Sequence, residues 1–232
     1  MGVVPPSSVT RSAPASVHSL SGAGAFRMSL ELQAHSDQRV GFIGQTRMGK
    51  TFLAEHMLDQ QPRVIVVDSK GHVNWKGYHL TDNPVAALMV DKVIFRPRGG
   101  KPPAEWWMEA VQVLHERGGG IIYVDEMSFI TDANRIDKGL ADAFRLGGEK
   151  GVGVWYSAQE TTTVHNTTLR QSEMLVCFYN QGASDRDKLA RIIGDMGFVT
   201  QYLPKYTFVV FVRGETYDHD AVPTYEVIPG NG

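Results

Sequence analysis

The stretch Val40–Thr51 constrains the fold of this chain more than any other part of its sequence. It reads VGFIGQTRMGKT, an apolar run followed at once by the pattern G-x-x-x-x-G-K-[ST] of a P-loop. The glycines of such a loop let the backbone turn tightly around an anion with its N–H groups facing inward, and the following helix points its positive end at the same place. The sequence therefore predicts a strand–loop–helix unit that binds nucleotide phosphates.

Two residues of this loop have specific expected roles. Lys50 would reach the β- and γ-phosphates, and the hydroxyl of Thr51 would hold Mg²⁺, so we expect Mg·ATP as the cofactor. The segment that follows carries apolar residues spaced for the helix that the motif requires. The predicted nucleotide-binding residues are Gly44, Gln45, Thr46, Arg47, Met48, Gly49, Lys50 and Thr51.

Composition places the chain among soluble globular proteins. Its 232 residues are 42% hydrophobic and 21% charged, and no apolar run approaches the ~20 residues of a membrane span. The N-terminus lacks the pattern of a signal peptide.

The single cysteine, Cys177, lies within an apolar run, where a buried small side chain is expected rather than a nucleophile. No disulfide or zinc framework is possible, which favours a reducing cytoplasm: that of the host if the protein is viral, with association with the virion as a further expected location.

The net charge of −2 does not by itself favour nucleic-acid binding. Any contact with DNA must come from a local patch, or from patches that several subunits bring together in a ring.

The chain divides into an N-terminal arm, residues 1–27, and a P-loop domain, residues 28–232. The arm is rich in Pro, Ser, Ala, Val and Gly without a sustained period, which is typical of a mobile tail, although an arm that docks on a neighbouring subunit has the same signature.

Strand and helix patterns alternate through the rest of the chain. Helices are expected after Lys50, from Pro103 to the glycines at 118–120, over Ile136–Leu146, and from a capping box at Ser184–Asp187. The alternation predicts an α/β fold with a mostly parallel central sheet and helices on both faces. The predicted strands are Met28–Leu32, Val40–Ile43, Arg63–Val67, Lys92–Arg96, Ile121–Glu126, Val152–Gln159, Glu173–Tyr179, Thr207–Val212 and Thr224–Ile228.

Two acids end the strand Ile121–Glu126, which we expect beside the P-loop strand. Asp125 would hold Mg²⁺ through its water shell, as the acid of a Walker B strand does. Glu126 would point beyond the γ-phosphate and polarise a water for in-line attack. The sequence therefore predicts hydrolysis as well as binding.

Gln159 ends the next strand and is the predicted sensor of the γ-phosphate. Phosphoryl transfer also needs positive charge against the developing oxyanions, often from a neighbouring subunit. Arg145 is the first candidate for that arginine, followed by Arg170 and Arg135. The predicted catalytic residues are thus Glu126, Gln159, Lys50 and Arg145.

Together these segments resemble the HerA–FtsK superfamily of DNA-pumping ATPases. The resemblance is carried by the P-loop, by Asp125-Glu126, by Gly151–Gln159 and by Asn180–Gly194, and it extends over roughly Val40 to Val212. The small size is most similar to the genome-packaging ATPases of membrane-containing icosahedral viruses.

This resemblance implies a RecA-like P-loop NTPase of the ASCE type that forms a ring, usually a hexamer, and threads double-stranded DNA through its pore. It also implies capsid or membrane-vertex proteins as partners. The chain departs from the family at two positions. Gly148 stands where the family usually has an arginine, and Glu160-Thr161 replaces the usual Arg-Pro after the glutamine.

Two loops are candidates for DNA contact, Arg96–Lys101 and Thr161–Asn166, since both follow strand ends. Two alternatives to DNA translocation stay open. One is an assembly ATPase that resembles the Zot-like proteins of filamentous phages, and the other is a nucleotide-binding structural subunit that does not hydrolyse ATP.

Overall fold

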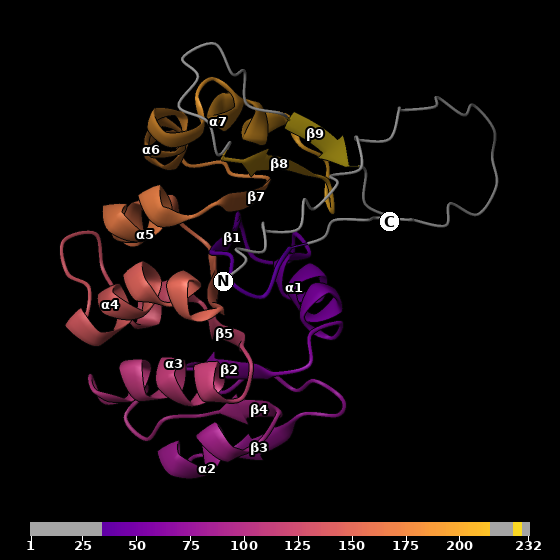
Figure 1. The fold of residues 1–232 in the computed structure, drawn as a ribbon. Helices are drawn as coiled ribbons and strands as arrows, with labels where there is room; N and C mark the ends of the chain where they lie inside the picture. Colours follow the sequence, from indigo (N-terminus) through magenta and orange to yellow (C-terminus); the bar gives the residue numbers. More distant parts are fainter. Residues whose placement is uncertain (1–33, 214–224, 229–232) are drawn as a thin grey trace, which may run out of the picture. The chain divides into compact units, whose positions relative to one another are not determined.

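A single mixed sheet organises the fold. The computed structural model describes residues 34–213 and 225–228, and the strands within these ranges form a nine-stranded sheet in the order β3-β4-β2-β5-β6-β1-β7-β8-β9 (Figure 1). In this spatial order all strands from β3 to β7, β1 and β2 included, run parallel to one another, whereas β8 and β9 are antiparallel to their neighbours. The strands are β1 Val40–Ile43, β2 Val64–Asp68, β3 His79–Thr81, β4 Lys92–Phe95, β5 Gly120–Asp125, β6 Val152–Ala158, β7 Met174–Phe178, β8 Phe208–Val212 and β9 Tyr225–Ile228.

Helices cover both faces of this sheet, as predicted. In Figure 1, α3, α4 and α5 lie on one side of the strands and α1 lies on the other. The α-helices are α1 Lys50–Leu58, α2 Pro84–Met89, α3 Trp106–Glu116, α4 Lys138–Leu146, α5 Asn166–Gln171, α6 Ala183–Ile193 and α7 Met196–Val199. Within the described residues, no helix has the length and apolar character needed to cross a membrane.

The central strands are buried on both faces, which explains their continuous runs of Val, Ile and Leu. One face packs against the apolar stripes of α3 and α4, where Trp107, Val111 and Phe144 are buried. Cys177 is also fully buried, and desolvation raises the pKa of its thiol to about 12, which fits its predicted role as a small core residue.

One predicted neighbour relation is wrong. The strand that ends in Asp125 does not lie beside the P-loop strand, because β6 is inserted between β5 and β1. In the observed register Ile43 pairs with Ala158, so the P-loop and Gln159 leave the sheet side by side. Asp125 pairs with Asp68 of β2 on its other side.

Two predicted helix starts are also wrong. The helix expected from Pro103 begins at Trp106, because the first turn is closed by a bond from the Trp106 N–H to the Pro103 carbonyl, three residues back (3.1 Å). Helix α6 has no side-chain cap. The helix begins at Ala183, so Ser184, the expected N-cap residue, lies within its first turn. The Asp185 carboxylate of the same segment accepts a hydrogen bond from the distant Thr162 N–H (2.7 Å).

The structure adds short elements that no sequence pattern indicated, namely β3, α2 and α5. β3 has three residues and only partial burial, so it carries no alternation to detect. The predicted arm of residues 1–27 and the predicted strand Met28–Leu32 lie outside the described residues.

Candidate nucleotide site at the carboxyl edge of the sheet

The P-loop backbone adopts conformations that its glycines permit. Gly44 has φ of 144°, and a Cβ there would lie 2.7 Å from the Phe178 side chain, so only glycine fits. Gly49 and Arg47 also have positive φ, 102° and 65°. The Gly44 N–H donates to the Ala158 carbonyl (3.1 Å), which fixes the loop to the end of β6.

Lys50, the first residue of α1, is held inside this loop. Its ammonium donates to the carbonyls of Gly44 (2.5 Å) and Gln45 (2.9 Å). Desolvation lowers the pKa of Lys50 to about 8, against the opposing effect of the Glu126 and Asp125 carboxylates. A phosphate that enters the loop would restore the preference of this group for its charged form.

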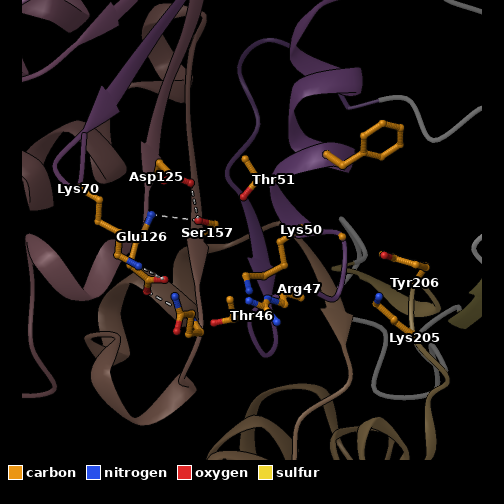
Figure 2. A pocket seen from close by; sticks show the side chains of 13 residues that line it. Thr46, Arg47, Lys50, Thr51, Lys70, Asp125, Glu126, Ser157, Lys205 and Tyr206 are labelled. Atoms are coloured by element: carbon orange, nitrogen blue, oxygen red, sulfur yellow. Dashed lines mark hydrogen bonds and ion pairs between the residues drawn. The ribbon is translucent and has the colours of Figure 1, made fainter. Parts of the chain in front are cut away.

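Thr51 and Asp125 provide the oxygen donors that Mg²⁺ prefers. The two side chains come from α1 and β5 and face each other across the same cavity (Figure 2). Burial, then the charges of Asp68 and Glu126, raise the pKa of Asp125, so a divalent cation would relieve an unfavourable accumulation of negative charge. The residues therefore fit the metal that the motif implies.

Ser157 links the two acids and was missed by the sequence reasoning. Its hydroxyl donates to Asp125 Oδ1 (3.3 Å) and accepts from the Glu126 backbone N–H (3.0 Å). This serine is buried, and it lies on β6, the strand next to the one that carries the acids. Only the register between β5 and β6 reveals that this buried hydroxyl lies next to the predicted Walker B pair.

Glu126 lies directly after β5 and is 3% exposed. Its carboxylate accepts hydrogen bonds from the Gln159 backbone N–H (3.1 Å), from the Ser128 hydroxyl (2.9 Å) and from the Lys70 ammonium (3.3 Å). The predicted base and the predicted sensor are therefore in direct contact, from two neighbouring strands.

These residues line one cavity of about 410 Å³ (Figure 2). In Figure 2, Lys70, Asp125 and Glu126 lie on one side of Lys50, at the polar end, and Lys205 and Tyr206 lie on the other side, at the aromatic end. Gln159 and Phe52 also line the cavity. The aromatic end was not anticipated. Phe52 belongs to α1 but is 78% exposed, and Tyr206 lies in the loop before β8.

The structure does not bring Arg145 into this cavity. It lies near the end of α4, 64% exposed, with an ion pair to Asp142 (2.9 Å). It lines a different cavity, at the amino ends of β1 and β7, together with Arg39 and Glu173. Arg170 and Arg135 are exposed and line neither cavity.

The first loop considered for DNA contact uses its cations internally. Arg96 pairs with Asp68 (2.8 Å), Arg98 pairs with Asp82 (2.7 Å), and Lys101 donates to the Ile130 carbonyl (3.2 Å). Of these, Arg98, with 84% of its side chain exposed, and Lys101 are exposed, and Arg96 is partly buried. The loop therefore offers less free positive charge than its sequence indicates.

The sheet topology and the cavity at the P-loop together define a P-loop NTPase fold with a mostly parallel sheet. Among solved structures, the chain is similar to the genome-packaging NTPase B204 of Sulfolobus turreted icosahedral virus 2 in complex with ATP-γ-S. The TM-score is 0.71 at 15% identity over 84% of this chain and 98% of that one. A second structure, of B204 described as the DNA-packaging ATPase of Sulfolobus turreted icosahedral virus, has a TM-score of 0.68 at 15% identity. The match covers 86% of this chain and all of that one.

A third similar structure is a fragment of EssC, ATPases 2 and 3, from Geobacillus thermodenitrificans. It has a TM-score of 0.52 at 12% identity, over 84% of this chain and 40% of that one. At these identities the likeness concerns the fold. No family model matches the sequence, and no curated protein matches it.

Proposed function

We propose that this protein is an ATP-driven translocase of double-stranded DNA that packages a viral genome into a preformed capsid. The observation that carries the proposal is the convergence of Lys50, Asp125, Glu126 and Gln159 on one cavity. The likeness of the fold to B204 supports the choice of DNA packaging among the many activities of P-loop proteins.

The P-loop and its lysine bind and orient the triphosphate. Backbone N–H groups of residues 44–51 and the Lys50 ammonium hold the phosphates, and Thr51 and Asp125 would hold Mg²⁺. When bound, the metal ion supplies positive charge against the β- and γ-phosphate oxygens. Because the cavity combines these groups, the γ-phosphate is expected near Glu126 and Gln159.

Hydrolysis follows by in-line attack. A water oxygen bonds to the γ-phosphorus while the bond from that phosphorus to the β–γ bridging oxygen breaks, and ADP leaves with the electron pair. Glu126 accepts the proton that the attacking water loses. Gln159 can report the loss of the γ-phosphate, since its backbone already contacts Glu126.

The second half of the site comes from a neighbouring subunit of a ring, which we propose to be a hexamer. Arg145 remains the first candidate for the arginine supplied in trans, because it is exposed and lines the cavity at the amino ends of the strands, not the cavity of its own P-loop. The predicted arm of residues 1–27 would dock on a neighbouring subunit, and capsid or membrane-vertex proteins would be further partners of the ring. The setting would be the host cytoplasm, with association with the virion.

The test is ATP hydrolysis by the full chain with and without double-stranded DNA. We expect DNA to stimulate the parent, and Glu126→Gln to lower kcat by about 10²-fold or more, the usual contribution of a general base. Glu109→Gln changes an exposed acid on α3 and is the matched control, with unchanged kcat expected.

Other outcomes would redirect the proposal. Hydrolysis that is indifferent to DNA would favour a virion or membrane assembly ATPase without translocation. Binding of ATP without any turnover by the parent would favour a structural nucleotide-binding subunit.

A further inference from the structure

Tyr123 lies on β5 two residues before Asp125, and its hydroxyl reaches the Asp125 carboxylate. Alternate residues of a strand share one face of the sheet, so the two side chains leave β5 on the same side. The Tyr123 hydroxyl donates to Asp125 Oδ1 over 3.4 Å. Tyr123 is fully buried, so this hydroxyl has no access to solvent. The proposed metal ligand therefore has a hydrogen-bond donor on its own strand.

The ring of Tyr123 is held by aromatic side chains from other parts of the chain. Phe42 of β1 meets it edge to face, with the ring centroids 6.5 Å apart and the planes at 79°. Trp75, between β2 and β3, stacks on it with centroids 5.6 Å apart and planes at 28°. A phenylalanine would fill the same space, and a buried hydroxyl costs free energy unless it is hydrogen-bonded. Packing alone therefore does not account for the hydroxyl.

Ser157 directs a second hydroxyl at the same carboxylate oxygen. Its Oγ lies 3.3 Å from Asp125 Oδ1, and Figure 2 shows this contact as a dashed line. Ser157 belongs to β6, so Oδ1 receives donors from its own strand and from the next one. Within residues 34–213 and 225–228, no group donates a hydrogen bond to Asp125 Oδ2. The two oxygens therefore differ: protein hydroxyls hold Oδ1, and Oδ2 is left for a ligand of the cavity.

We propose that Tyr123 is a positioning residue of the metal site: its hydroxyl, with that of Ser157, holds Oδ1 so that Oδ2 of Asp125 stays available to Mg²⁺. Outer hydrogen bonds of this kind orient a ligating carboxylate and strengthen the binding of its metal. The inference rests on the proposed ATPase site, but it requires neither turnover nor DNA nor a ring. A hydroxyl that only stabilised the core would leave the affinity for Mg²⁺ unchanged.

The test compares Tyr123→Phe with Tyr156→Phe in the full chain. Tyr156→Phe is the matched control, because it also removes one fully buried strand hydroxyl, which contacts Ser172 Oγ (3.0 Å) and not the acids. Binding of ATP-γ-S is measured in EDTA and at rising concentrations of MgCl₂. In Tyr123→Phe, we expect the Mg²⁺ concentration that gives half of the gain in affinity to rise about 10- to 100-fold. The affinity in EDTA should stay parental, and Tyr156→Phe should change neither quantity.

Three results would overturn the proposal. The first is a parental Mg²⁺ requirement in Tyr123→Phe. The second is a loss of affinity that is equal in EDTA and in MgCl₂, which would show that the hydroxyl supports the fold of the whole site. The third is a parent whose affinity does not depend on Mg²⁺. Absence of hydrolysis by a parent that binds ATP-γ-S with Mg²⁺ would contradict the proposed ATPase alone, and the titration would still decide the role of Tyr123.

A second measurement tests the contact without any ligand. Urea unfolding of the metal-free parent, Tyr123→Phe, Asp125→Ala and the double variant forms a double-mutant cycle. Non-additive shifts of the unfolding midpoint support the contact between the hydroxyl and the carboxylate. Additive shifts would contradict it.

Discussion

Buried charged groups at the two edges of the sheet differ in how far their surroundings compensate the cost of burial. At the carboxyl edge, the pKa of Lys50 is lowered to about 8 and that of Asp125 is raised, chiefly because burial disfavours their charged forms. At the amino edge, Arg39 holds Glu173 through three hydrogen bonds of 2.8, 3.1 and 2.8 Å. Burial alone would raise the pKa of Glu173, but the hydrogen bonds and charge of Arg39 lower it.

The carboxyl edge therefore has the character of a ligand-binding site, whereas the Arg39–Glu173 pair at the amino edge stabilises the fold. At the amino edge Arg39 and Glu173 are each other's partners within the chain, and this pair joins the start of β1 to the start of β7. At the carboxyl edge, charges that are costly in the protein alone would be compensated by phosphates and a cation. Substitutions at the first edge should therefore lower stability, and substitutions at the second should lower activity.

The largest expected effect is the loss of hydrolysis in Asp125→Asn. A neutral amide cannot replace the carboxylate toward Mg²⁺, so kcat should fall by about 10²- to 10³-fold, comparable to the loss of one electrostatic contact to the transition state. The raised pKa of this acid means that its charge destabilises the folded chain at neutral pH. The midpoint of urea unfolding should therefore be unchanged or higher. A large loss of stability would contradict the comparison.

The opposite pattern is expected for Arg39→Met. Its side chain donates to Glu173 in a bidentate pair and also to the Phe144 carbonyl (3.2 Å). Removing these bonds should destabilise the fold by about 1–3 kcal/mol, as for a charged hydrogen-bonded group left without its partner. The activity of the folded fraction should stay near that of the parent. Urea unfolding measures the first effect and ATP hydrolysis per folded protein the second.

The sequence predicted the parts of the site that belong to contiguous motifs. The P-loop, Asp125-Glu126 and Gln159 each follow a strong strand pattern, and the structure brings them to one cavity. Lys70 and Ser157 escaped prediction because their roles depend on which strands are neighbours. The order β2-β5-β6-β1 is set by tertiary packing, and no pattern within a single strand reports it.

The fold shows the same limit. The long buried strands and the helices α3 and α4 were predicted, because their sequence patterns extend over several residue pairs or helical turns. The short β3 and α2 were missed because they have too few residues to show a period. The capping box failed because the helix begins at Ala183, which places Ser184 inside the first turn and not at the N-cap.

A pH titration of nucleotide binding tests the carboxyl edge with no substitution. The free protein should lose the Lys50 proton as pH rises through about 8, whereas bound phosphates favour the charged form. Affinity for ATP should therefore fall about tenfold between pH 7 and pH 9, which corresponds to one pKa unit of lost protonation. Lys50→Met, measured at higher ATP concentration, should bind weakly with no such dependence. A parental affinity that is constant over this range would contradict the lowered pKa.

The smallest expected effect concerns the aromatic end of the cavity. Phe52 is 78% exposed on α1 and lines the same cavity as Tyr206 and Lys205, which lie together in Figure 2. A nucleobase that extends from the P-loop would stack there, so Phe52→Ala should weaken ATP binding about threefold to tenfold, the range for loss of one aromatic contact to a base.

Inorganic tripolyphosphate separates this role from phosphate binding, because it has no base to stack. Its affinity should be the same for the parent and for Phe52→Ala, whereas the affinity for ATP falls. Val85→Ala removes another exposed apolar side chain, on α2, and is the matched control. An equal loss for both ligands would place Phe52 with the phosphate-binding groups, and the carboxyl edge would then act through charge and backbone alone.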